Sequence, residues 1–587
     1  MTVLNIEHSL SGLSWKMPSA DDRCTAALAQ QFNLSETVAR IMASRGITPD
    51  TAPAFLSPTL KENLPNPLTL RDMERAAERM ADAVMAGEPI GLMGDYDVDG
   101  ATSTSVLKLF LEDIGVTVHT FIPEREDGYG PNALKMQEFW DLGCRLVATL
   151  DCGMTAFEPI AAGRRVGLDI IVLDHHDPEK QLPDAYAVVN PKRLDEPLDH
   201  PCHGMAAVGV VFLFTVALNT ILRRRGFYTP ARPEPNLIRF LDLVAFGTVC
   251  DVMKLQGVNR LFVKAGLTQM RRGENKGLAA LAAQVGLSEP PEAYHLGYVF
   301  GPRVNACGRV GHSDLGMQLL SCRDSIRAAA LAQQLDDLNL TRRDIESAVL
   351  LEAIEQAEDK PQSDSFLFVH GDHWHQGVIG IVAGRLKDRY NLPVFALSIE
   401  GDDVKGSARS VQGVDLGTLV MNALALGILS RGGGHPMAAG FSLSRDRLDD
   451  FYHYLQENIR PESVMNQATS LDIAGVLDIM GATPDLARQL SLLAPFGEGN
   501  PEPKFVIRNV MIGRCIPLKN GHIACTLTGR GGGSLKAIAF RVADTQLGQS
   551  LMTARDAYFH VAGVLKLDTW NGRTGVQFQI QDMANAL

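Results

Sequence analysis

Short apolar runs alternate with longer amphipathic stretches between about residues 70 and 255. The apolar runs have the length of buried strands, and the stretches between them have helical periodicity. This alternation is typical of a parallel sheet with helices on both faces. Ala101–Ile114 and Asn132–Leu142 are predicted helices. The predicted strands are Pro89–Met93, Leu146–Leu150, Ile170–Leu173 and Leu243–Cys250.

Outside this region the pattern changes several times. Ser325–Glu358 contains no Gly or Pro and predicts one long helix that would connect two lobes. From about residue 504 onward, short β-branched runs and the turn signal Asn571-Gly572 predict a small closed barrel, with the OB type among the candidates. The expected boundaries are 1–65 for a helical preface, 66–255 for the first α/β domain, 256–360 for a helical region with the connector, 361–464 for a second α/β domain and 465–587 for the β domain.

An acidic motif follows each of the four apolar runs. Gly94–Gly100 contains three aspartates, Asp151 precedes Cys152-Gly153, Asp174 is followed by two histidines, and Asp251 ends the last run. Because the carboxyl ends of parallel strands meet at one sheet edge, up to six carboxylates and two imidazoles would gather there. Such a set would repel itself unless cations held it together. The sequence therefore predicts a site for two divalent metals, which suits phosphoester hydrolysis by metal-activated water.

These motifs, with others further along the chain, resemble the DHH phosphoesterase superfamily and, within it, the RecJ family of single-strand-specific exonucleases. The resemblance implies a DHH domain, a DHH-associated α/β domain joined to it by a long helix, and a C-terminal OB-like barrel. It also implies Mn²⁺ or Mg²⁺ and 5′ to 3′ digestion of single-stranded DNA in repair and recombination. The additional motifs are Phe300–Arg309, His373–Ala383, Gly406–Ser410, Gly432–His435 and Phe496–Pro503.

The metal ligands are expected among the acidic motifs and the histidine pair. Since imidazole among carboxylates suits Mn²⁺ better than Mg²⁺, we expect two cations with Mn²⁺ preferred. Asp151 is the candidate bridging carboxylate. The five expected ligands are Asp97, Asp99, Asp151, His175 and Asp251.

Three other residues of the motifs, His176, Asp95 and Asp174, are expected beside the metal ligands. Neighbouring side chains at the end of an extended strand point in opposite directions, so one histidine of the pair should bind metal and the other should contact phosphate or water. We expect His175 to be the ligand and His176 the phosphate or water contact, with the reverse left open. Asp95 is expected either as a direct ligand or as a partner of one, and Asp174 as a residue that orients an imidazole.

Several polar residues are expected to bind the substrate strand. Guanidinium groups hold phosphate with two hydrogen bonds, and by resemblance Ser407 and Arg409 belong to a pocket for the 5′ phosphate, which Arg125 would join. Glycine backbone amides at Gly433 can approach a strand closely. Trp570, beside the predicted hairpin turn, is the expected stacking platform for a base. The full set is Arg125, Arg303, Asn305, Arg309, Ser407, Arg409, Gly433, His435 and Trp570.

Net charge, cysteine content and hydropathy indicate the expected ligand class and cellular compartment. The 587 residues carry a net charge of −13, which argues against nucleic acid, yet residues 465–587 hold 11 Lys and Arg against 9 Asp and Glu, a balance of +2. The nine cysteines form no CxxC pair, so a reducing, cytoplasmic compartment is expected, and Cys152 is interpreted as a packing residue. We expect no secretory signal and no membrane span, and Met205–Leu218 is interpreted as a buried helix.

Two other classes of function remain open at this point. A small-molecule DHH hydrolase, acting on short oligonucleotides, cyclic dinucleotides or pyrophosphate, would usually lack the β domain at 465–587. A non-catalytic, Cdc45-like scaffold would have lost metal ligands, and none of the expected ones is missing here. From the family we expect single-stranded DNA as substrate, a monomer, and partners such as single-strand-binding protein and a RecQ-type helicase.

Overall fold

The computed structural model describes residues 2–125, 130–359, 365–460, 470–554, 557–570 and 573–586, without the side chains of 569, 570 and 573. The chain divides into two compact units, each assembled from separate stretches of sequence. Unit 1 comprises Met1–Leu64, Lys254–Leu261 and Ala468–Leu587, so the N-terminal helices belong with the C-terminal β domain. Unit 2 comprises Pro65–Met253 and Phe262–Gln467.

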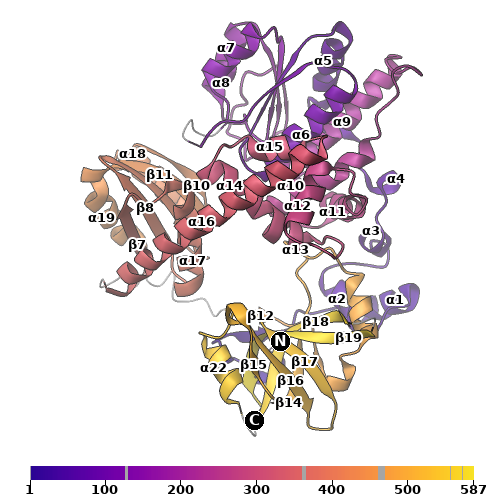
Figure 1. Cartoon of the computed structure of the whole chain (residues 1–587), viewed down its shortest axis with the longest axis vertical. Helices are drawn as coiled ribbons and strands as arrows, with labels where there is room; N and C mark the ends of the chain where they lie inside the picture. The colour runs from indigo at the N-terminus through magenta and orange to yellow at the C-terminus, as the bar shows by residue number, and fades with distance from the viewer. Residues whose placement is uncertain are drawn as a thin grey trace. The chain divides into compact units, whose positions relative to one another are not determined.

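Unit 2 begins with the predicted parallel sheet, drawn in indigo and violet in Figure 1. Its strand order is β3-β2-β4-β5-β6, and every neighbouring pair is parallel. The strands are five residues or shorter. β2, β4 and β5 are almost wholly buried, as expected for a sheet covered on both faces, whereas the edge strand β3 is half-buried. Their bounds are β2 Ile90–Gly94, β3 Val118–Phe121, β4 Leu146–Leu150, β5 Asp169–Leu173 and β6 Ala187–Val189.

Helices cover both faces of this sheet. α7 (Ala133–Asp141) and α8 (Phe157–Arg165) pack one face through a cluster that includes Met136, Ile160 and Ile170. The other face is covered by α5 (Met73–Ala86), α6 (Val98–Asp113) and α9 (Ala207–Arg224).

α9 is long and apolar enough to cross a membrane by length and composition alone. In this fold it packs against α5, α6 and α10 (Leu241–Cys250), and most of it is buried inside the protein. The helix therefore serves as a core element of the first lobe, as the sequence predicted.

One predicted strand is wrong. Leu243–Cys250 is not a strand but most of α10, which ends at Asp251 as its C-terminal cap. An unbroken apolar run of eight residues is equally consistent with a strand or a helix that is buried all round, because periodicity cannot separate the two. Asp251 therefore approaches the sheet edge from a helix end instead of from a strand end.

A helical region and a connector follow. α16 runs unbroken through 35 residues, about 52 Å at 1.5 Å per residue, and confirms the predicted long helix. Its first half packs against α12, α14 and α15, and its second half packs against α17 and β7 of the second lobe. The bounds are α11 Gly257–Met270, α12 Lys276–Gln284, α13 Ala293–His295, a π-helical turn Leu296–Phe300, α14 Gly301–Val310, α15 Leu315–Leu320 and α16 Ser325–Asp359.

The second lobe of unit 2 is a five-stranded mixed sheet in the order β10-β11-β9-β8-β7. α17 packs one face with α16, and α18 and α19 pack the other around Phe395, Phe441 and Phe451. Gly432–His435 lies in the edge strand β10. The bounds are β7 Leu367–Asp372, α17 Gln376–Tyr390, β8 Val394–Glu400, β9 Asp403–Arg409, α18 Leu416–Ala425, β10 Arg431–His435, β11 Ala438–Ser444 and α19 Leu448–Asn458.

Unit 1 contains the predicted β domain. Strands pair in the cyclic order β14-β16-β17-β19-β18 and back to β14, so five strands close a ring, with β17 and β19 parallel. This is the connectivity of a small OB-like barrel. The turn Asn571-Gly572 lies outside the described residues. The bounds are β12 Ser470–Asp472, β13 Gly475–Leu477, α21 Pro484–Ser491, β14 Lys504–Ile512, β15 Ile516–Pro517, β16 Ile523–Gly529, β17 Ser534–Ala539, α22 Gln546–Thr553, β18 Tyr558–Trp570 and β19 Arg573–Asn585.

The N-terminal residues are part of the same unit. β1 (Ser14–Lys16) pairs with β12, and the fully buried Trp15 donates its indole N–H to Oδ2 of the buried Asp582 at 2.7 Å. Helices α1 (Asp22–Phe32), α2 (Glu36–Ser44) and α3 (Ala52–Leu56) share one apolar core with the barrel strands, and α4 (Leu60–Asn63) follows.

We predict that Trp15→Phe destabilises unit 1 by about 2–3 kcal/mol, because the ring is retained but the buried Asp582 carboxylate loses a charge-assisted hydrogen bond. The measurement is amide hydrogen exchange, with faster exchange expected in β14, β18 and β19. Trp374→Phe is the matched control, since Trp374 donates to Glu352 at 2.7 Å in unit 2. Unchanged protection of the barrel strands in Trp15→Phe would contradict the assignment of this bond.

Candidate metal centre

Three aspartates follow neighbouring strands at one level of the first sheet. Gly94, Leu150 and Leu173 are register partners at the ends of β2, β4 and β5. The next residue in each case is an aspartate, namely Asp95, Asp151 and Asp174. Asp151 has φ of +61°, a left-handed conformation that is uncommon for a non-glycine residue and tends to mark functional sites.

The structure brings the expected ligands together. Donor atoms of Asp99, His175 and Asp251 all lie within 4.8 Å of one another, and so do those of Asp95, Asp97 and Asp151. His175 connects the two groups, because its Nε2 lies 3.9 Å from Asp99, 3.4 Å from Asp151 and 3.5 Å from Asp251. We call this set the carboxylate cage; its members are Asp95, Asp97, Asp99, Asp151, His175 and Asp251.

His175 has the tautomer and charge that a metal ligand needs. Its Nδ1 lies 3.1 Å from the carbonyl oxygen of Met205, so Nδ1 carries the proton and donates it. Nε2 is buried and accepts no hydrogen bond among the described residues, which leaves its lone pair directed at the carboxylates. Burial, with the charge of His176 next, lowers the pKa of His175 to about 4, so the ring is neutral at pH 7.

The cage carboxylates are buried and repel one another. Burial, and then the neighbouring carboxylates, raise the pKa values of Asp95, Asp99 and Asp151 well above the ordinary range. The same causes raise the pKa of Asp251 to about 7. Among the described residues, Oδ1 of Asp95 and Oδ2 of Asp251 are buried without a hydrogen-bond partner. Oxygen donors and one neutral imidazole, left unsatisfied in a buried site, fit divalent cations.

Two cage members also hold helix ends. Both oxygens of Asp99 accept amide hydrogens at the start of α9, from Ala207 at 2.7 Å and from Val208 at 2.9 Å. Asp97 accepts from the amide of Gly100 as the N-cap of α6. A carboxylate offers about four lone-pair directions, so these bonds orient the groups and still leave capacity for a metal.

His176 is chemically different from its neighbour. Its Nδ1 lies 2.7 Å from Oδ1 of Asp174. Burial alone would lower the pKa of His176, but the hydrogen bond to Asp174 and the surrounding carboxylates raise it to about 9. Asp174 has a pKa lowered to about 2, because the bonds and charge of His176 outweigh its burial. His176 is therefore a half-exposed cation beside the cage, which suits contact with an anion more than with a metal.

Beside the cage four arginines gather, and among the described residues only one of them, Arg342, pairs with a carboxylate. Arg125, Arg342 and Arg409 all lower the pKa of Arg309, which burial lowers first, to about 10. Within the described part of the chain, no carboxylate lies within 4 Å of Arg125, Arg309 or Arg409. We call Arg125, Arg309, Arg342 and Arg409 the arginine cluster. It suits a phosphate group, because the three arginines with no carboxylate within 4 Å among the described residues favour an incoming anion.

Arg342 was missed in the sequence analysis. It lies in the middle of α16, where an arginine is ordinary, and it also pairs with the buried Glu346 at 2.8 Å. Only the packing of α16 beside α14 brings its charge near Arg309. The local sequence carries no signal for this role.

The cluster is held by backbone carbonyls from both lobes of unit 2. Arg125 Nε donates to the carbonyl of Gly308 at 2.9 Å, and its guanidinium lies over the Tyr96 ring. Arg309 donates to the carbonyl of Gly377 at 2.9 Å, which ties α14 to the start of α17.

The other expected substrate contacts fall in different places. Ser407 accepts from Arg409 at 3.2 Å, and Gly380 leaves room beside them, since a Cβ there would lie 2.9 Å from Ser407 Oγ. Gly433 is exposed on β10, and His435 Nδ1 lies 3.7 Å from Asp177, two residues after His175.

Two α14 residues make structural contacts, and one residue is not described. Arg303 is engaged by Asp336 of α16 at 2.8 Å and by the carbonyl of Val299. Asn305 Oδ1 accepts from the amide of Val98 at 3.1 Å, so it holds the N-terminus of α6, where Asp97 and Asp99 lie. The side chain of Trp570 lies outside the described residues.

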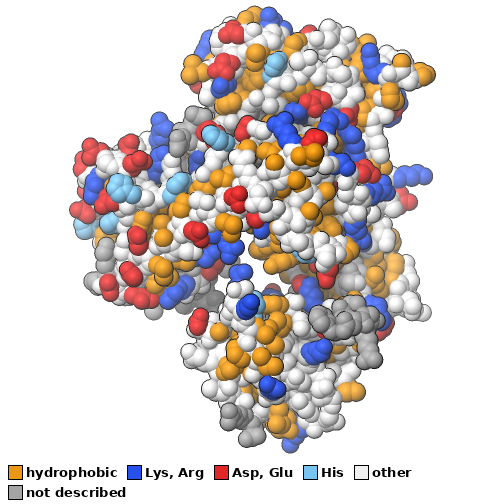
Figure 2. Space-filling view, viewed as in Figure 1, with side chains coloured by type: hydrophobic (Ala, Val, Ile, Leu, Met, Phe, Trp, Pro, Cys, Tyr) orange, Lys and Arg blue, Asp and Glu red, His pale blue; other side chains and the backbone are white. Residues whose placement is uncertain are grey.

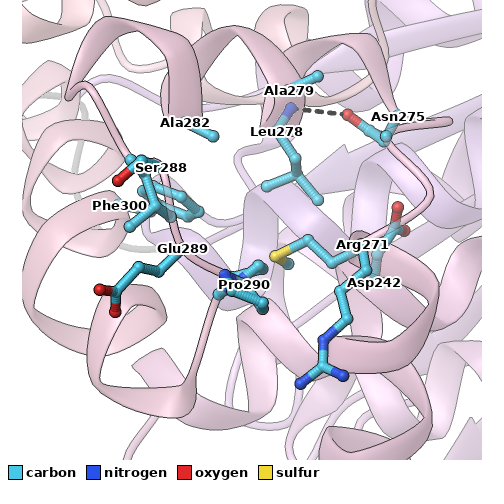
Figure 3. A pocket seen from close by; sticks show the side chains of 14 residues that line it. Asp242, Arg271, Asn275, Leu278, Ala279, Ala282, Ser288, Glu289, Pro290 and Phe300 are labelled. Atoms are coloured by element: carbon cyan, nitrogen blue, oxygen red, sulfur yellow. Dashed lines mark hydrogen bonds between the residues drawn. The ribbon is translucent and has the colours of Figure 1, made fainter. Parts of the chain in front are cut away.

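Figure 3 shows a separate cavity of about 360 Å³, lined by Asp242 among others. Asp242 lies at the start of α10, whereas Asp251 follows the end of that helix. The walls of the cavity are mostly apolar, with Leu278, Pro290 and Phe300 among them, and it contains no cage residue. The buried Asp242 also lines it, with a pKa that burial raises to about 7. Its position separates it from the metal centre, because α10 spans about 14 Å between Asp242 and Asp251.

Comparison with known proteins agrees with this geometry. Models of three families match: the DHH family N-terminal domain over residues 89–248, the DHHA1 domain over 363–460 and the RecJ OB domain over 473–582. The single-stranded-DNA-specific exonuclease RecJ of Bacillus subtilis is 32% identical over 586 residues, covering 98% of this chain and 71% of the relative. The chain belongs to the RecJ family. RecJ of Escherichia coli is 34% identical over 530 residues, covering 86% of this chain and 89% of its own length.

Solved RecJ structures share the fold. The crystal structure of RecJ from Thermus thermophilus in complex with Mn²⁺ has a TM-score of 0.81 at 29% identity, covering 98% of this chain and 80% of that one. A structure of the same protein with Mg²⁺ gives a TM-score of 0.75 at 27% identity. The α/β fold with a parallel-sheet DHH domain, a DHHA1 domain and a RecJ OB domain is therefore confirmed, and Mn²⁺ and Mg²⁺ are the cations that the cage fits.

We predict that Mn²⁺ affinity rises with pH through about 7. Asp251 must lose a proton to bind metal, and its folded pKa is about 7. In the metal-free protein a carboxyl with a raised folded pKa stays protonated to a higher pH than it does in the unfolded chain. Between about pH 4 and 7 the unfolded chain therefore binds fewer protons than the folded protein, and the free energy of unfolding falls as pH rises. Bound Mn²⁺ should remove that loss. The measurement is the Mn²⁺-induced rise in Tm, expected to be larger at about pH 8 than at about pH 5.5.

Asp251→Asn should abolish most of this pH-dependent Mn²⁺ response. Asp242→Asn is the matched control, because Asp242 is also buried with a raised pKa but lies at the other end of α10. A Tm rise that is equal at both pH values in the unsubstituted protein would contradict the protonation of the cage.

Proposed function

We propose that this chain is a metal-dependent exonuclease that removes nucleotides from the 5′ end of single-stranded DNA. The observation that carries the proposal is the juxtaposition, in one unit, of a carboxylate cage suited to divalent cations and an arginine cluster suited to a terminal phosphate. The curated relatives are named single-stranded-DNA-specific exonucleases, and the OB domain supports binding of a single strand.

In this proposal each group of residues has one task. Asp97, Asp99, Asp151, His175 and Asp251 hold two divalent cations, Mn²⁺ or Mg²⁺, with Asp95 as a further donor. When bound, such cations lower the pKa of water and stabilise the entering and leaving oxygens of a phosphodiester. His176, protonated through Asp174, faces the anionic substrate from the side of the cage.

The remaining residues orient the strand. Arg125, Arg309, Ser407 and Arg409 receive the terminal phosphate, while Arg303 and Asn305 position α14 and the N-terminus of α6. Gly433 and His435 on β10 approach the strand from the second lobe, and Trp570 stays a predicted stacking residue of the barrel. A net charge of −13 does not oppose this function, because Figure 2 shows Lys and Arg interspersed with Asp and Glu over the visible face, so that local fields decide.

The domain assignment and the cellular setting follow from the same proposal. We propose 66–255 as the DHH catalytic domain, 256–360 as the helical region with the connector, 361–464 as the DHH-associated domain and 465–587 as the OB-like domain, after the preface 1–65. The protein acts as a cytoplasmic monomer in DNA repair and recombination, in the company of single-strand-binding protein and a RecQ-type helicase.

The direct test uses a single strand of about 30 nucleotides, labelled at either end, incubated with Mn²⁺. Stepwise loss from the 5′ end is expected, with no digestion of a blunt duplex and none by Asp151→Ala, which removes a cage carboxylate. Digestion of a fragment of about three nucleotides but not of the long strand would indicate a small-substrate hydrolase instead. Binding without any digestion would indicate a non-catalytic scaffold.

We predict that Arg409→Ala selectively weakens use of a 5′-phosphorylated strand. Loss of one charge-assisted contact of about 1.5–3 kcal/mol corresponds to a fall in kcat/KM of roughly 10- to 150-fold on that strand. A 5′-hydroxyl strand should be affected much less. Arg389→Ala, at a half-exposed arginine paired with Glu358 on the outside of α17, is the matched control. An equal loss on both strands would argue against a terminal-phosphate contact.

A further inference from the structure

Two exposed tyrosines are stacked on each other on the outer side of the helical segment that leads into α14. Tyr294 is 61% exposed and Tyr298 is 74% exposed. Their ring centroids lie 5.2 Å apart with an interplanar angle of 27°. We call Tyr294 and Tyr298 the tyrosine pair. The side chains are large and apolar, yet most of their surface faces water, which marks a candidate contact surface.

The fold holds the pair outward through the opposite side of the same segment. Phe300 is fully buried and meets Phe246 of α10 edge-on, with centroids 6.4 Å apart. Cys250 Sγ donates to the carbonyl of Leu296 at 3.4 Å, which joins the segment to the end of α10 beside Asp251. The turn Leu296–Phe300 is π-helical, an irregularity common at functional sites. The tyrosine pair is therefore displayed on an anchored helix instead of a mobile loop.

The same helical segment runs from the tyrosine pair into the candidate site. Tyr298 precedes Asn305 by seven residues, roughly 10 Å along a helix axis, and Tyr294 precedes it by roughly 16 Å. Asn305 accepts from the amide of Val98 at the start of α6, beside Asp97 and Asp99, and Arg309 belongs to the arginine cluster. The pair is thus within reach of a strand of a few nucleotides whose end lies at the cage.

The charges around the pair favour contact with bases over contact with phosphates. The cavity in Figure 3 is lined by Phe300 of the same helical segment and by two charged residues of opposite sign, Arg271 after α11 and Glu289 after α12. Such a mixed surface has no net attraction for a phosphate backbone. Aromatic rings stack on any base, because every base has a π face, and each stack contributes about 1–3 kcal/mol.

We propose that Tyr294 and Tyr298 form a stacking platform for bases of the single strand, on the 3′ side of the nucleotide held at the cage. The inference rests on the proposed function, since it takes single-stranded DNA as the substrate. Two rings that are already stacked can extend the column of bases and hold the strand between successive cleavage steps. The platform is independent of sequence and depends on bases, not on phosphates.

The test measures binding separately from digestion. The Mn²⁺-loaded protein is titrated with a fluorescent strand of about 20 nucleotides that carries hydrolysis-resistant phosphorothioate linkages at its 5′ end. A second strand has the same backbone but abasic positions a few nucleotides from that end. The unsubstituted protein should bind the ordinary strand more tightly. Tyr294→Ala and Tyr298→Ala should each weaken that binding about fivefold or more, and the double variant should bind the two strands almost equally.

Controls separate stacking from a general structural effect. Tyr298→Trp retains a stacking surface and should bind like the unsubstituted protein. Leu198→Ala removes an 86% exposed apolar side chain elsewhere in unit 2 and should change nothing. If the double variant still prefers the ordinary strand as strongly as the unsubstituted protein does, the platform is overturned and the pair is better explained as a protein contact.

Digestion of an all-phosphate strand is scored in parallel. Absence of 5′ digestion by the unsubstituted protein, together with the expected binding pattern, would refute the proposed exonuclease and retain the platform. Normal 5′ digestion, together with no effect of the tyrosine substitutions on binding, would retain the proposed exonuclease and refute the platform.

Discussion

The structure depends on the electrostatic repulsion among the carboxylates of the cage, which the protein's own residues do not neutralise. Five carboxylates are packed around the neutral imidazole of His175, and burial together with mutual repulsion raises the pKa of Asp95, Asp99, Asp151 and Asp251. Buried like charges at these separations need opposite charge among them. Divalent cations supply this opposite charge. The same metal ions therefore stabilise the folded site and provide its chemistry.

The elements around the cage hold these groups in place against that repulsion. Strand register aligns Asp95 and Asp151 at one level, while the start of α9 holds Asp99 through two backbone amides. The positive charge lies beside the cage and comes from other elements. The arginine cluster includes residues of α14, of the middle of α16 and of β9 in the second lobe. Metal binding and phosphate binding thus occupy neighbouring sites of opposite charge, and α16 packs against both lobes that form them.

Local patterns predicted a large part of this arrangement. The parallel strands, the long connector and the barrel strands follow from period and length, and the aspartates follow because parallel strands end at one edge. The run Leu243–Cys250 misled, since a helix buried on every side has no polar face to reveal its period. The glycines of Gly432–His435 were expected to bring backbone amides close to the substrate strand, and pairing with β11 places them in an edge strand, which no local pattern had indicated.

The sequence by itself determined which chemical groups are present and in what order along the chain: carboxylates after apolar runs, a histidine pair after one of them, and most of the arginines in later motifs. Tertiary structure alone decided how those groups act. The carbonyl of Met205 sets the tautomer of His175, Asp174 keeps His176 charged, and helix packing brings Arg342 near Arg309. The physical reason is that tautomer, charge and partner depend on atoms distant in sequence, whose positions only the packed fold establishes.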